Sequence, residues 1–125
     1  MGANLYAAIE DESFNANESD RVFVCKHQEE LDAVAASLGV KPLSSFFSYS
    51  QEEIADQGME APEGLEAQWF SPDEVSKTLS AFIGKLEASP EVKDAGRLLE
   101  ELQDLLQVAV ETKQKSTQLR FFVGL

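Results

Sequence analysis

The sequence predicts an α+β fold: a small, mainly antiparallel sheet of N-terminal and C-terminal strands, with a two-helix hairpin and shorter helices packed on one face. Apolar residues alternate with other residues near both ends of the chain, which is typical of strands with one buried face. Between residues 72 and 115 they recur instead at helical spacing. A length of 125 residues with 43% hydrophobic residues is enough for one core, so we expect a single globular domain over residues 1–125.

Three strands are predicted, over residues 4–10, 21–25 and 118–124. In the first, Leu5, Ala7 and Ile9 fall on one face. The second is short, β-branched and aromatic. The third follows Ser116-Thr117 and has two faces, one with Leu119, Phe121 and Val123 and the other with Arg120 and Phe122. A polar segment over residues 11–20 is predicted to be a loop.

Two shorter helices follow the second strand. A helix over residues 28–38 is predicted to end at Gly39, which suits the left-handed position, with Pro42 preventing continuation. Ser50 and Glu53 form a capping box that starts the next helix. Glycine and proline interrupt residues 57–69, which are therefore predicted to be mainly a loop.

The hairpin is predicted from residues 72–88 and 89–115. Ser71 caps the first helix, Pro72 takes its first position and Glu74 completes the cap. Ser89-Pro90 ends this helix and starts the second almost at once. The second helix carries one apolar stripe, made of Val92, Ala95, Leu99, Leu102, Leu106 and Ala109, and a second row, made of Leu98 and Leu105. A face that broad is predicted to be buried within this domain.

Residues with catalytic chemistry are scarce. Cys25 is the only cysteine and His27 the only histidine, which leaves too few ligands for cysteine-rich or histidine-rich metal sites. On a strand the two would share one face, but Cys25 belongs to an apolar run and His27 opens a helix. The glycines are isolated, so they form no phosphate-binding loop. We expect no catalytic residues, no cofactor and no metal.

The net charge constrains the partners. With 10 basic and 23 acidic residues, the formal charge is −13. Such a charge repels nucleic acids and anionic membranes and attracts basic proteins. The N-terminus has no basic segment followed by a long apolar run, and no apolar stretch approaches the ~20 residues that span a bilayer. A cytoplasmic protein is therefore expected.

Acidic residues and apolar anchors are interleaved between Pro42 and Ser76, a span that contains no Lys or Arg. A surface that binds a basic partner needs acidic residues, which orient the partner as it approaches, and apolar residues, which supply most of the binding energy. The alternative is that Trp69 and Phe70 turn inward to cover the hairpin and leave the acids as a solvated rim. The candidate interaction surface consists of Glu52, Glu53, Asp56, Met59, Glu60, Glu63, Glu66, Trp69, Asp73 and Glu74.

Two motifs in this part of the chain, Pro42-Leu43-Ser44-Ser45-Phe46-Phe47-Ser48 and Gln68-Trp69-Phe70, carry a resemblance. Together with the two helices and the aromatic C-terminal strand that follow, they resemble a set of short uncharacterised bacterial proteins. The resemblance implies no activity.

Three classes of function fit this sequence. The leading hypothesis is a small acidic interaction module without catalytic turnover, such as an inhibitor or immunity-type binder of a basic partner. The second is a small-ligand binder or minor enzyme with a pocket between the helix hairpin and the aromatic segment 43–49, lined by Phe46, Phe47 and Tyr49. The third is a self-associating structural protein, for which a homodimer is the simplest form.

Overall fold

The computed structural model describes residues 3–11 and 20–124 and has the predicted α+β fold. Residues 12–19, most of the predicted polar loop, lie outside the described part. The elements, in chain order, are β1 (Asn4–Ile9), α1 (Val22–Lys26), α2 (Gln28–Leu38), a 3₁₀ turn (Leu43–Phe46), α3 (Gln51–Asp56), α4 (Pro72–Ala88), α5 (Ala95–Gln114) and β2 (Leu119–Gly124).

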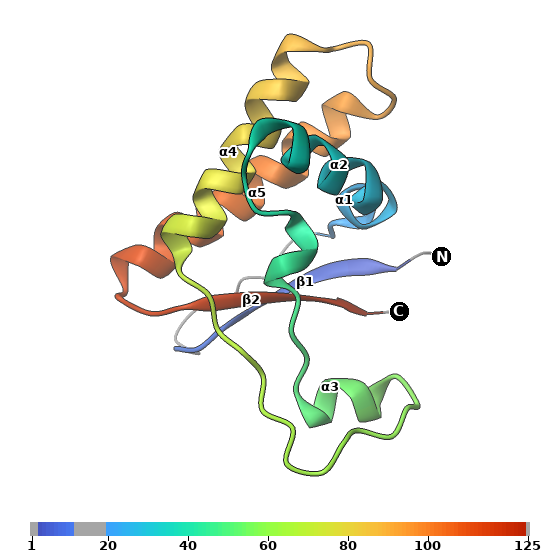
Figure 1. Ribbon diagram of the computed structural model, residues 1–125, viewed down its shortest axis with the longest axis vertical. Helices are drawn as coiled ribbons and strands as arrows, with labels where there is room; N and C mark the ends of the chain where they lie inside the picture. The colour runs from blue at the N-terminus through green and yellow to red at the C-terminus, as the bar shows by residue number, and fades with distance from the viewer. Residues whose placement is uncertain (1–2, 12–19, 125) are drawn as a thin grey trace.

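The two ends of the chain form the sheet. β1 and β2 pair antiparallel, in a register that runs from Asn4 opposite Gly124 to Ile9 opposite Leu119. On one face the side chains of Leu5, Ala7 and Phe121 are buried, and they join one hydrophobic core with α4 and α5. Figure 1 shows α4 and α5 side by side above this face, so the predicted hairpin on the sheet is confirmed.

The opposite face of the sheet is covered by residues 48–69, which we call the arm; it contains α3. Figure 1 shows α3 on the side of the sheet away from α4 and α5. Both ends of the arm are tied to β2 by backbone hydrogen bonds: Ser48 N donates to Phe121 O (3.0 Å) and Phe70 N, just after the arm, donates to Leu119 O (2.8 Å). The arm therefore closes over the side chains that alternate with the core residues of β2.

The apolar rows are buried or partly buried within α5, whereas Val92, which was predicted to belong to the same stripe, precedes the helix and is 37% exposed. Leu98, Leu102, Leu105 and Ala109 are all at most 2% exposed, and Leu99 and Leu106 pack partly buried against the core. The chain itself supplies the cover for its longest helix.

Helices with local capping residues begin and end where the sequence predicts. α2 ends at Gly39, which has a φ of 71°, and Val40 N donates to Ala35 O to close the turn. Ser50 and Glu53 form the predicted capping box of α3. At α4 the Ser71 hydroxyl accepts from Asp73 N, but the Glu74 carboxylate lies 2.9 Å from Lys41 Nζ instead of completing the cap.

The strand predicted over residues 21–25 is wrong: Val22–Lys26 form helix α1. The reason is a long-range cap. The Glu101 carboxylate, on α5, accepts hydrogen bonds from the backbone N–H groups of Phe23 (3.2 Å) and Val24 (2.8 Å). The first N–H groups of a helix have no acceptor within the helix. In α1 the side chain of the N-cap residue, Arg21, does not supply one.

The predicted start of the second long helix is also wrong, because α5 begins at Ala95 instead of Ser89. Residues 89–94 form successive tight turns, in which Val92 N donates to Ser89 O and Ala95 N donates to Val92 O. Asp94 ends the turns with a left-handed φ of 63°. Asp94 is held in place by the ring of His27, whose Nε2 lies 2.9 Å from its carboxylate.

Candidate functional site

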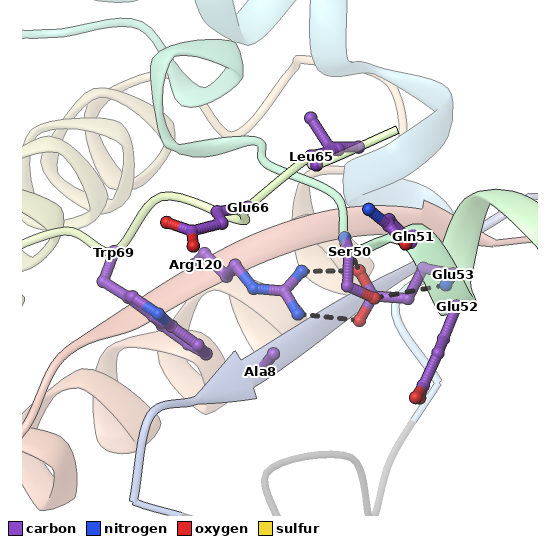
Figure 2. Close-up of a pocket in the computed structure, with 10 residues that line it drawn as sticks. Ala8, Ser50, Gln51, Glu52, Glu53, Leu65, Glu66, Trp69 and Arg120 are labelled. Carbon is purple, nitrogen blue, oxygen red and sulfur yellow. Dashed lines mark hydrogen bonds and ion pairs between the residues drawn. The ribbon is translucent and has the colours of Figure 1, made fainter. Parts of the chain in front are cut away.

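Arg120 lies at the centre of the contact between the arm and the sheet, and its side chain is only 6% exposed. Its two terminal nitrogens meet the Glu53 carboxylate, Nη1 to Oε1 at 2.5 Å and Nη2 to Oε2 at 2.9 Å. Nη1 also donates to Ser48 O at 2.8 Å. Figure 2 shows this two-pronged pair between β2 and α3. The contact fixes the arm to the second face of the sheet, because both partners are at least four-fifths buried.

Glu53 has two structural roles. Its backbone N–H and carboxylate form the capping box with Ser50, and its carboxylate binds Arg120. Burial on its own would raise the pKa of the Glu53 carboxyl, but hydrogen bonds from Arg120 and from the Ser50 backbone outweigh burial, so this pKa lies below its ordinary value. Glu53 is thus held in its charged form.

A pocket of about 630 Å³ opens beside this pair. Its polar side chains include three carboxylates, Glu52, Glu53 and Glu66, and one guanidinium, Arg120, so their formal charges sum to −2. Figure 2 shows Glu66 and Trp69 on one side of the Arg120 guanidinium and Glu53 on the other. The remaining lining residues are Ala8, Ser50, Gln51, Gly64, Leu65 and Trp69.

Aromatic rings flank the guanidinium of Arg120. Its Cζ lies 4.9 Å from the ring centroid of Trp69 and 5.5 Å from that of Phe122. Within the described residues, the buried Nε of Arg120 has no hydrogen-bond partner. A buried N–H without an acceptor costs about 1–3 kcal/mol, so this atom is the unsatisfied point of an otherwise well-bonded group.

Three of the predicted surface acids are paired with bases that are remote in sequence. Glu53 binds Arg120, Asp73 lies 2.7 Å from Lys113, and Glu74 lies 2.9 Å from Lys41. The span from Pro42 to Ser76 therefore contains no basic residue of its own, but basic residues from other parts of the chain lie against its acids. Among the salt bridges of the described residues, none involves the other five predicted acids, which all lie exposed on the arm: Glu52, Asp56, Glu60, Glu63 and Glu66.

Three apolar residues of this span, Met59, Trp69 and Phe70, have different environments. Phe70 turns inward and meets the buried Phe46 edge-on, with 5.6 Å between the ring centroids. Trp69 is half-buried and covers Arg120 instead of the hairpin. Met59, which follows α3 in the chain, is 57% exposed. The inward orientation predicted for the pair thus holds for Phe70, whereas Met59 and part of Trp69 face solvent with the arm acids.

Cys25 and His27 do not share a strand face, because both belong to the α1–α2 region. His27 is buried at the junction of the two helices. Its Nδ1 lies 2.9 Å from Glu30 and its Nε2 lies 2.9 Å from Asp94, so both ring nitrogens are committed to carboxylates. Burial and the charge of Glu101 raise the pKa of the Cys25 thiol, which disfavours the reactive thiolate.

The aromatic segment 43–49 packs against the body of the protein. Phe46 is 1% exposed, Phe47 bridges Phe121 on β2, and the Tyr49 hydroxyl accepts a hydrogen bond from Val123 N at 3.0 Å. None of these three aromatic residues lines the 630 Å³ pocket. In the part of the chain that the structure describes, no group of three or more His, Cys, Asp or Glu residues has an arrangement that would hold a metal ion.

Arg120, the central residue of the contact between the arm and the sheet, is not among the residues that the sequence predicts for the interaction surface. The sequence pattern places Arg120 only on the second face of the last strand, because alternation cannot show that a segment from elsewhere in the chain covers that face. The signal in the sequence that could have identified Arg120 is its position between Leu119 and Phe121. A basic residue in an apolar strand needs an acidic partner when it is buried.

Among the described helices, none has both the length and the apolar character to cross a bilayer. Comparison with known proteins gave no matching family model, no matching curated protein and no matching solved structure.

Proposed function

We propose that this chain is a small acidic protein-interaction module without catalytic turnover, which binds a basic partner through the arm. The observation that carries the proposal is the arm's charge: its five exposed acids take part in none of the salt bridges of the described residues. Since unpaired charges of one sign on a projecting segment attract and orient an oppositely charged protein, the arm is suited to rapid recognition of a basic surface.

The arm also offers apolar contacts within the same surface. Met59 is 57% exposed, and Leu65 and Trp69 line the pocket beside Arg120. Apolar and aromatic side chains supply most of the energy at protein interfaces, while the surrounding charges mainly set the rate and orientation of association. An inhibitor or immunity-type protein would have this combination.

The test is a comparison of two charge-matched triple variants. The arm variant carries Asp56→Asn, Glu60→Gln and Glu63→Gln; the control carries Glu29→Gln, Glu87→Gln and Glu91→Gln, which are exposed acids outside the arm. Both variants change the net charge equally. Binding to immobilised short poly-lysine is measured at low and high salt.

We expect the arm variant to lose more affinity at low salt than the control, and we expect the difference to shrink at high salt because exposed charges are screened. Equal losses for the two variants would show that only the overall charge matters, and the arm would then not be the binding surface.

The small-ligand alternative now has a different location from the one that the sequence suggested. Phe46 is a core residue, whereas the pocket beside Arg120 has converging carboxylates. Self-association is tested independently by light scattering of the purified chain, where a concentration-dependent mass would favour a homodimer.

A further inference from the structure

The pocket beside Arg120 has two unmet requirements that a single kind of ligand group would satisfy. Its formal charge of −2 remains after Arg120 is counted, because Glu53 neutralises Arg120 while Glu52 and Glu66 have no base in the salt bridges of the described residues. The pocket therefore favours a cation. An acidic lining alone would not specify a ligand, but the second requirement is chemically distinct.

The second requirement is an acceptor for Arg120 Nε. Arg120 is 5% exposed, it is one of the residues that line the pocket, and its buried Nε has no hydrogen-bond partner within the described residues. The Glu53 carboxylate occupies the Nη1–Nη2 edge of the guanidinium, which leaves the edge that includes Nε. A carbonyl or carboxylate oxygen placed there would satisfy a donor that is costly to leave unbonded.

A peptide residue with a cationic side chain meets both requirements, since its main-chain carbonyl lies a few bonds from its ammonium or guanidinium group. We propose that the pocket binds a lysine or arginine residue of the basic partner. The side-chain cation contacts Glu66 and the ring of Trp69, and the residue's main-chain carbonyl accepts a hydrogen bond from Arg120 Nε. This inference rests on the proposed function, because it names the group by which the partner is held.

The geometry also provides a reporter. The Trp69 ring centroid lies 4.9 Å from Arg120 Cζ, and Figure 2 shows the indole on the same side of the guanidinium as Glu66. Trp69 lines the pocket and is the only tryptophan in the chain. Its fluorescence therefore reports binding at this site.

The experiment titrates the full chain with Nα-acetyl-arginine amide and follows Trp69 fluorescence together with the NMR signal of Arg120 Nε–H. The neutral isostere Nα-acetyl-citrulline amide tests the need for the cation, and butylguanidinium tests the need for the carbonyl. We expect saturable changes of both signals with the arginine compound, none with the citrulline compound, and no shift of the Nε–H signal with butylguanidinium.

Two variants locate the site. Glu66→Gln is expected to weaken binding of the arginine compound roughly two- to fivefold, the usual range for one solvent-accessible ion pair. Glu63→Gln removes the same charge from a position on the arm that does not line the pocket, and its effect should be smaller. Equal effects of the two variants, or equal binding of the citrulline compound, would overturn the proposal.

The two proposals fail in different ways. If poly-lysine binding depends on the arm acids but neither Trp69 nor Arg120 responds to the arginine compound, the arm is the interaction surface and the pocket is not its binding site. If poly-lysine binding does not depend on the arm acids either, both proposals are wrong.

Discussion

At the residue scale, the pair formed by Arg120 and Glu53 decides how the arm is held. The Arg120 side chain is 6% exposed and keeps its charge, so removal of the Glu53 carboxylate leaves a buried cation that retains the Ser48 carbonyl as an acceptor and two aromatic rings beside it, but no counter-charge. Removal of one partner of a buried ion pair strongly lowers the free energy of unfolding, because the other charge stays buried without compensation. Replacement of both partners by apolar residues can cost much less. The role of Glu53 is therefore structural, although it belongs to the predicted interaction surface.

We predict that Glu53→Gln lowers the free energy of unfolding by about 2 kcal/mol or more, because it leaves the Arg120 charge buried without its counter-charge. The matched control is Glu52→Gln, which removes the same charge from the neighbouring exposed position and should stay within about 0.5 kcal/mol of the wild type. Urea unfolding measures both. Equal effects of the two substitutions would contradict the assigned role of the pair.

His27 gives the molecule a predicted pH dependence. Hydrogen bonds with Asp94 and then with Glu30 raise the pKa of His27 above its ordinary value in the folded state. Since the folded pKa is the higher one, the charged imidazole stabilises the fold fully below the unfolded pKa of about 6.5. That contribution is lost as the pH rises through the folded pKa.

We therefore expect the free energy of unfolding to fall between about pH 6 and the folded pKa of His27, and we expect this fall to be absent from His27→Gln. Denaturant unfolding at a series of pH values measures it, and the assignment is simple because the chain has a single histidine. A profile that is the same in the variant would show that another group titrates there.

At the scale of secondary-structure elements, prediction from the sequence succeeded where the determining residues are local. α2 and α4 have the bounds predicted for them, because Gly39 and Ser71-Pro72 mark their ends in the chain itself. The α1 segment was predicted as a strand because its composition favours one, and the residue that overrides this preference, Glu101, lies more than 70 positions away.

We predict that Glu101→Ala destabilises α1 in particular. Loss of an N-terminal cap costs about 1–2 kcal/mol, and the amides of Phe23 and Val24 would lose their acceptor. Native-state hydrogen exchange should show faster exchange at these two amides than in Glu100→Ala, which removes the adjacent exposed carboxylate. Unchanged protection of Phe23 and Val24 would contradict the long-range cap.

The candidate site could be predicted only in part, for the same physical reason. The acids of the arm and their apolar neighbours are adjacent in sequence, so their grouping could be read directly. The bases that neutralise Glu53, Asp73 and Glu74 come from other elements, and their proximity depends on the tertiary fold. The pocket was likewise not predictable, because it is formed where α3 and the return of the arm meet β2.

At the scale of the whole molecule, the sheet brings the two ends of the described chain together, since Asn4 is the register partner of Gly124. We predict that a circular permutant, with its ends joined by a short Gly/Ser linker and new ends at Gly58, folds with the helix content of the wild type. Gly58 lies at an exposed turn on the arm, where chain breaks are tolerated.

The matched control opens the chain at Gly84 inside α4, a helix that supplies Leu79, Phe82 and Leu86 to the core. This permutant is expected to lose cooperative unfolding. Circular dichroism and thermal unfolding compare the two. If both permutants had the same helix content and unfolded with the same cooperativity, an intact α4 would not be required for the fold.

The position of β2 at the end of the described chain also has a consequence for biosynthesis. β1 has its partner strand, and the arm has Arg120, only after residues 119–124 are available. Until these residues have been synthesised, β1 therefore lacks its hydrogen-bonding partner strand, and Glu53 on α3 lacks Arg120. The sheet and the contact between Arg120 and Glu53 thus cannot form before residues 119–124 are synthesised, and a ribosome that stalls before residue 119 would present an incomplete fold to chaperones and proteases.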